Sequence, residues 1–230
     1  MKTTYTYKIL QNIHEDGRNW WSACNKFSHG VNWKKQIDDN LVNKLAGTTK
    51  SDAEKILIPF LNNLYIKEKK NIDYAQEFFE GEFAKKFQKG CEKMEEVMKR
   101  PIYRTDFTIF LTTLRRGPYN KSKGQVWTCI YWDHPVASFL HELCHFQFIH
   151  YWRENPDSEV FKLSNDQFEF LKESLTMILD EDFFPLIRKP DYGYDLHQEF
   201  RKELKEFWKK EKDFDKLVEF GTNEIKKLIS

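Results

Sequence analysis

Two histidines and a glutamate form the group with the clearest chemical potential in this sequence. They stand in the run His141-Glu142-Leu143-Cys144-His145. Each residue of a helix turns by about 100°, so residues four apart differ by only about 40° and share one face. Two imidazoles on one face can bind the same metal ion, typically zinc. Glu142 lies beside that face, where a carboxylate can take a proton from a water on the metal.

The run is expected on a helix of about residues 135–152. Asp133 can cap the start of this helix, and Pro135 is tolerated in its first turn. The sequence Asn155-Pro156-Asp157 breaks it. Cys144 points away from the metal face at its place in the run, so we expect it to serve in packing.

Two segments before this helix favour strands. Residues 107–114 and 126–132 are rich in β-branched and aromatic side chains. The polar segment between them contains Gly117, Pro118 and Gly124, which are typical of turns. The sequence therefore predicts two strands joined as a hairpin with a long loop.

A hydrolytic zinc site needs a third protein ligand and one open position for water. His150 lies about 140° around the helix from His145 and faces away from the metal. Glu173, on a second predicted helix over 164–180, is the best candidate. The alternatives are Asp180, Glu181 and His197.

Hydrolysis of an amide at zinc also needs a donor for the oxygen that becomes negative. The segment 191–201 offers Tyr194, His197 and Arg201. His197 and Arg201 are four apart and share a face of a helix predicted over about 196–210, while Tyr194 precedes that helix. The alternative is a helix entry with ordinary surface side chains.

A His-Glu-x-x-His helix followed by a second helix with a glutamate resembles the gluzincin branch of the zincin metallopeptidases. The resemblance covers about residues 105–210. It implies a Zn²⁺ cofactor held by His141, His145 and Glu173. It also implies hydrolysis of a peptide or protein substrate by water that Glu142 activates. A tyrosine or histidine after the third ligand often stabilises the oxyanion in gluzincins, a role that Tyr194 or His197 would take.

The same resemblance implies a small twisted sheet above the first helix, with the strand 126–132 at the edge of the cleft. Gluzincins often place an aspartate one turn after the third ligand, whereas Met177 stands there in this sequence. Support for a histidine ligand is then expected from Asp180 or from backbone carbonyls.

The remaining pattern is helical. Apolar residues at helical spacing predict helices over about 52–69 and 73–99, expected as an antiparallel pair, and a last helix over 213–229. We expect an α+β fold in a single domain over residues 1–230, mostly helical with a small antiparallel or mixed sheet. Residues 1–100 form its mainly helical N-terminal part, and residues 101–230 form the catalytic core.

Composition excludes several classes of partner. Charged residues make up 32% of the chain but cancel to a net charge of +1, which gives no footprint for nucleic acid. The sequence contains no apolar run of the length that a membrane helix needs. The four cysteines form no Cys-x-x-Cys pair and the N-terminus is polar, so we expect reduced thiols in a cytoplasmic protein.

Two other functions share the same residues. One is a non-catalytic binding or regulatory module that keeps the zincin fold. The other is a zinc hydrolase that acts on a non-peptide amide or ester, because the same chemistry serves all acyl transfers. The sequence leaves open the substrate, exo- versus endopeptidase action and the oligomeric state.

Overall fold

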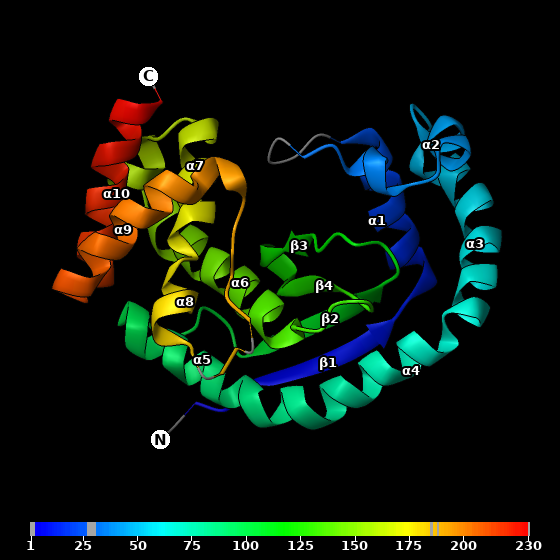
Figure 1. Ribbon diagram of the computed structural model, residues 1–230, viewed down its shortest axis with the longest axis horizontal. Helices are drawn as coiled ribbons and strands as arrows, with labels where there is room; N and C mark the ends of the chain where they lie inside the picture. The colour runs from blue at the N-terminus through cyan, green and yellow to red at the C-terminus, as the bar shows by residue number, and fades with distance from the viewer. Residues whose placement is uncertain (1–2, 27–30, 185, 188, 230) are drawn as a thin grey trace. The chain divides into compact units, whose positions relative to one another are not determined.

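The computed structural model describes residues 3–26, 31–184, 186–187 and 189–229 (Figure 1). The chain forms two compact units, each assembled from separate stretches of sequence. We call them the sheet unit and the helical unit. The mostly helical content and one small mixed sheet confirm the expected α+β class, while the single domain stays a prediction. The sheet unit consists of Thr6–Ala84 and Asp106–Pro135, and the helical unit of Met1–Tyr5, Lys85–Thr105 and Val136–Ser230.

Four strands form the sheet, in the order β1-β2-β4-β3. β1, β2 and β4 are parallel, whereas β3 is antiparallel to β4. β2 lies between two neighbours and is buried at every position after its first, as is typical of a central parallel strand. The strands are β1 Thr6–Gln11, β2 Asp106–Thr112, β3 Tyr119–Asn120 and β4 Gln125–Cys129.

The predicted hairpin of segments 107–114 and 126–132 is wrong in its pairing. β2 and β4 run parallel, with Thr108 opposite Gln125. The antiparallel partner of β4 is β3, and Gly124 turns the chain just before β4 with a φ of 59°, which glycine adopts without strain. The connection after β2 carries the chain past the position of β4, so the hairpin forms one strand later than the sequence suggested.

β1 lies in the part of the chain that was expected to be mainly helical. It pairs with β2 from Thr6 opposite Asp106 onward. Tyr7 and Ile9 are half-buried while Lys8 and Leu10 are exposed, which is the alternation of an edge strand. Six residues of this pattern are too few to distinguish a strand from a loop by sequence alone.

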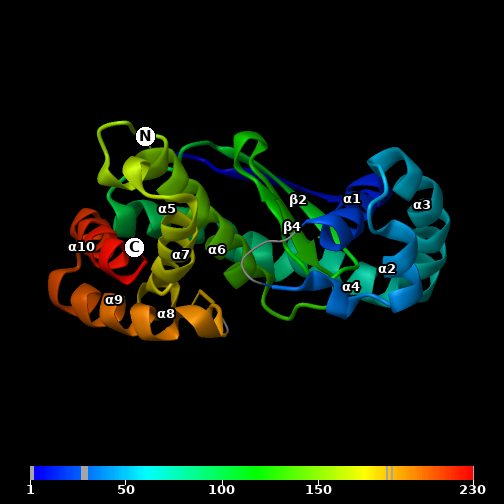
Figure 2. The same ribbon diagram turned by 90° about the horizontal axis from the view of Figure 1, so that it is seen from above.

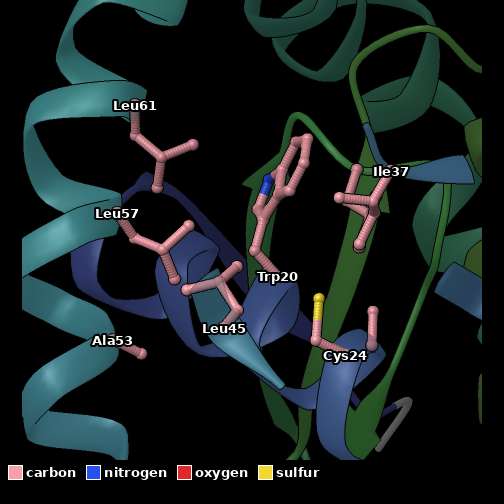
Figure 3. Packing of buried hydrophobic residues seen from close by; sticks show 9 residues of the cluster. Trp20, Cys24, Ile37, Leu45, Ala53, Leu57 and Leu61 are labelled. Atoms are coloured by element: carbon pink, nitrogen blue, oxygen red, sulfur yellow. The ribbon is translucent and has the colours of Figure 1, made fainter. Parts of the chain in front are cut away.

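α1, α2 and α3 of the sheet unit share one hydrophobic cluster. Its buried members include Trp20 and Cys24 of α1 and Leu57 and Leu61 of α3 (Figure 3). Asn12 caps α1 by accepting bonds from two backbone N–H groups. The helices are α1 Ile13–Asn25, α2 Asp39–Leu45, α3 Lys50–Lys67 and α4 Lys69–Phe78.

The predicted antiparallel pair of helices 52–69 and 73–99 is also wrong. α3 and α4 follow each other along an arc (Figure 1), separated only by Glu68. Residues 67–70 around this junction contain no glycine or proline, so no helix-breaking residue forces the chain to reverse there. α4 continues through a π-helical turn, Phe79–Phe83, into α5 Ala84–Met98.

Asp16 joins three elements of the sheet unit. Its carboxylate accepts hydrogen bonds from the hydroxyls of Thr112 at 2.5 Å, Thr113 at 2.8 Å and Tyr65 at 3.1 Å. Burial raises the pKa of Asp16, and the hydrogen bonds from the two threonines and Tyr65 oppose that rise. The carboxylate therefore links α1 to α3 and to the end of β2.

In the helical unit, α7 lies between α6 and the pair α9 and α10 (Figure 2). α6 spans Pro135–Phe148 and continues as a π-helical turn, Ile149–Arg153, which matches the helix expected over 135–152. The other helices are α7 Asn165–Leu175, α8 Ile178–Asp182, α9 Gln198–Glu211 and α10 Phe214–Leu228.

The helix predicted over 164–180 divides after Leu175. The backbone carbonyl of Glu173 accepts hydrogen bonds from the Thr176 hydroxyl at 2.8 Å and from Arg201 Nη1 at 3.2 Å. A continuous helix would offer this carbonyl to the N–H of Met177, which donates to Ser174 instead. Side-chain donors thus compete with the helical bond and end α7 close to Glu173.

Candidate metal centre

α6 places His141 and His145 on one face, as the spacing predicts. Their ring centroids lie 4.4 Å apart. His145 is buried, while the side chain of His141 keeps 19% of its surface exposed. The imidazole of His141 therefore stays in contact with solvent. An ion or a substrate can enter the site from the side of this ring.

Glu173 of α7 reaches both imidazoles. Its Oε2 lies 3.4 Å from Nε2 of His141, and its Oε1 lies 3.2 Å from Nε2 of His145. The three candidate ligand atoms all lie within 4.8 Å of one another. Two imidazole nitrogens and one carboxylate oxygen are a donor set that suits zinc, so these residues could hold a metal ion.

The alternative third ligands lie elsewhere. Asp180 accepts a bond from the backbone N–H of Asp191 at 2.7 Å and pairs with Lys205 at 2.9 Å. The ring of His197 packs against Phe170, with centroids 4.4 Å apart. Among the residues that the structure describes, the grouping with metal-ligand geometry contains only His141, His145 and Glu173.

Protonation of the two histidines differs for a physical reason. Burial lowers the pKa of His145 to about 3, so its imidazole is neutral and able to bind a metal. Burial also acts to lower the pKa of His141, but the charge of Asp191 and the contact with Glu173 outweigh it and raise that pKa. A metal ion would have to displace a proton from His141.

Glu142 is half-buried beside His141, and one of its carboxylate oxygens is buried and unused. Its Oε2 has no hydrogen-bond partner among the described residues. Burial raises the pKa of Glu142 to about 8, and the charges of Glu173 and Asp191 add to this effect while His141 opposes it. A half-buried carboxyl with a raised pKa and one unpaired, buried oxygen is suited to exchange protons with a small molecule that enters the site.

Asp191 contacts the ring nitrogen of His141 that faces away from Glu173, and no motif in the sequence pointed to this role. Its Oδ2 lies 3.1 Å from His141 Nδ1. Burial acts to raise the pKa of Asp191, but the charge and hydrogen bond of His141 and the charge of Arg201 lower it overall. The support expected from Asp180 is therefore one step further away, because Asp180 binds the backbone of Asp191.

Arg201 holds the elements around this group together. Its guanidinium is buried and donates to the carbonyl of Asp191, to the Thr176 hydroxyl at 2.7 Å and to Asp180 Oδ2 at 3.3 Å. Gly193, with a φ of 62°, permits this approach, since a Cβ there would lie 2.9 Å from Arg201 Nη1. These contacts favour a positioning role, and the expected role of Arg201 as an oxyanion donor stays a prediction.

Tyr194 and His197 are the remaining donors that the segment 191–201 offers, and they contact each other. Tyr194 is half-buried, and its pKa is raised first by burial and then by the charges of Glu173 and Glu142. His197 is buried, and its ring centroid lies 5.7 Å from that of Tyr194, so it packs against the tyrosine that could act as a donor.

A buried lysine at the centre is a second feature that the sequence analysis missed. Lys172 Nζ lies 3.2 Å from Glu173 Oε1 and 2.7 Å from Glu169 Oε2. In the structure, five consecutive residues of α7, from Leu171 to Leu175, are buried. The apolar residues at helical spacing around position 172 were the sequence signal that could have indicated the burial of this lysine. Lysine is almost never fully buried unless it is paired.

Two residues near the run take no part in the group. His150 lies in the π-helical turn after α6 and pairs with Glu154 at 3.7 Å, as its helical angle predicted. Cys144 is buried, and burial raises the pKa of its thiol. A neutral buried thiol is a packing residue.

No family model, no curated protein and no solved structure matches the chain. Among the described residues, the helices are all too short or too polar to cross a membrane. The chemistry of the centre therefore rests on its own residues.

Proposed function

We propose that this protein is a zinc-dependent peptidase in which His141, His145 and Glu173 hold the metal. One observation carries the proposal. The ligand group, in which His145 and Glu173 are buried, lies beside Glu142, whose Oε2 is buried and has no hydrogen-bond partner among the described residues. Buried polar atoms are nearly always hydrogen-bonded. An unpaired oxygen at this place therefore supports a hydrogen-bond partner that is part of the reaction, such as the attacking water.

The residues of the chain would divide the work as follows. Bound zinc supplies a Lewis acid that polarises a carbonyl and lowers the pKa of water. Glu142 takes up a proton from the attacking water and passes it to the leaving amine. Tyr194 donates a hydrogen bond to the oxygen that becomes negative.

The peptide bond is proposed as the target because the ligand pattern resembles that of gluzincin peptidases. The same residues would also serve an amide or ester hydrolase, or a non-catalytic module that retains the centre. The four cysteines are free and buried, which supports the proposed location in the cytoplasm, where thiols stay reduced.

The test combines zinc content with one substitution. Protein purified from zinc-replete medium should contain about one zinc per chain by elemental analysis. Glu142→Gln should keep this zinc and lower the hydrolysis of a fluorogenic peptide library by about 100-fold or more, as expected for loss of a general base. Glu154→Gln is the control, since Glu154 follows the same helix and is exposed.

Each other outcome has a definite meaning. Protein free of zinc after this purification would contradict the metal centre. Bound zinc with no hydrolysis of peptides, amides or esters would favour the non-catalytic module. Hydrolysis of amides or esters alone would keep the chemistry and replace the substrate.

A further inference from the structure

α7 buries a lysine against one of the candidate metal ligands. The side chain of Lys172 is fully buried, whereas its outer partner Glu169 has 41% of its side-chain surface exposed. Burying an ammonium is costly unless it is well paired. The pair with Glu169 could form at the surface, as other lysine–glutamate pairs of this chain do, so the burial of Lys172 calls for a role at Glu173.

The two oxygens of Glu173 have different surroundings. Oε1 lies 3.2 Å from Lys172 Nζ and 3.2 Å from His145 Nε2. Oε2 lies 3.4 Å from His141 Nε2. A divalent cation and the ammonium of Lys172 would therefore compete for the single negative charge of the Glu173 carboxylate.

We propose that Lys172 is the internal counter-ion of the metal centre: it neutralises and positions Glu173 when no ion is bound, and it weakens the binding of a divalent cation. The proposal rests on the proposed function, because it assumes that this centre binds zinc. Its consequence is that the chain folds without the metal and releases it more readily than an uncompensated site would. Many small structural zinc sites behave in the opposite way and unfold when the metal is removed.

The first test is a zinc titration against a chromogenic chelator. Lys172→Met should lower the dissociation constant for zinc by roughly tenfold or more, since it removes a unit charge in contact with a ligand oxygen. Metal-free Lys172→Met should melt about 5 °C or more below the metal-free wild type, because a buried carboxylate loses its cation. Neither readout depends on catalytic activity.

Lys209→Met is the matched control. Lys209 also pairs with a glutamate three residues earlier, Glu206 at 3.2 Å, but its side chain is 52% exposed. Its removal should change the dissociation constant by less than about twofold and leave the melting temperature almost unchanged, because exposed pairs contribute little. The contrast separates contact with Glu173 from a general loss of positive charge.

Glu169→Gln gives a second test that leaves the buried lysine in place. Without Glu169 the ammonium keeps its contact with Glu173 at 3.2 Å and loses a competing carboxylate, so zinc should bind about threefold more weakly or worse. The sign is opposite to that of Lys172→Met. A merely structural lysine predicts no such pair of opposite shifts.

The outcomes distinguish the two levels of the proposal. A wild-type chain that binds no zinc contradicts the proposed function itself. A wild-type chain that binds zinc, with Lys172→Met binding no more tightly and melting at the same temperature, contradicts only the role of Lys172. Tighter binding by Lys172→Met together with weaker binding by Glu169→Gln supports that role.

Discussion

The Oδ2 atom of Asp191 lies 3.1 Å from the Nδ1 atom of His141, on the side of the ring opposite to the nitrogen that faces Glu173. A carboxylate in this position fixes the orientation and tautomer of a metal-binding imidazole and makes it more basic. Asp191 is itself held by Asp180 through its backbone N–H and by Arg201 through its carbonyl. The support of one candidate ligand is therefore built from three separate elements of the helical unit.

Asp191→Ala should weaken zinc binding by about 10- to 100-fold, because His141 loses the group that orients it. A chelator competition measures the change directly. Asp195→Ala is the control, since Asp195 is an exposed aspartate in the same loop region. Equal zinc affinities of the two variants would contradict a role of Asp191 in orienting His141 for the metal.

Tyr194→Phe should leave the zinc affinity unchanged and lower kcat by about 10²- to 10³-fold, the usual cost of losing one oxyanion donor. The hydroxyl alone is removed, so the packing against His197 remains. Tyr192→Phe provides the comparison, because Tyr192 is 71% exposed. A kcat for Tyr194→Phe within twofold of the wild type would assign the donor role to another group.

Asp16→Asn should destabilise the sheet unit without touching the metal centre. Asparagine keeps one oxygen, but its amide nitrogen cannot accept the hydrogen bonds made to the other, which are that of Thr112 at Oδ1 or those of Thr113 and Tyr65 at Oδ2. Loss of bonds to a buried carboxylate costs about 2 kcal/mol, which corresponds to a fall of about 4–8 °C in Tm.

Calorimetry measures the fall in Tm of Asp16→Asn, with Asp39→Asn as a control at an exposed position. Zinc content should be unchanged in both variants, because the centre lies within the helical unit. A variant as stable as the wild type would show that the hydrogen bonds of Asp16 contribute nothing net.

The pairing of strands shows where local pattern stops being informative. The β-branched segments 107–114 and 126–132 were found as strands, and each begins within two residues of its observed position. The parallel pairing of these two strands was not predicted. It depends on β1, whose partner lies far away in the sequence, and on the short β3, which pairs with β4. Alternation of side chains identifies a strand but carries no information on its neighbour.

Sequence alone determined the part of the centre that lies within one helix. The four-residue spacing of His141 and His145 fixes a shared face through the geometry of the α-helix, and Glu142 follows from the same geometry. Glu173 was reached because a second helix offered a suitable ligand. Tertiary structure decided the rest: Asp191 beside His141 and Lys172 beside Glu173. The contact between Asp191 and His141 depends on how a distant loop packs onto α6, and the burial of Lys172 depends on the helices around α7, which no local spacing encodes.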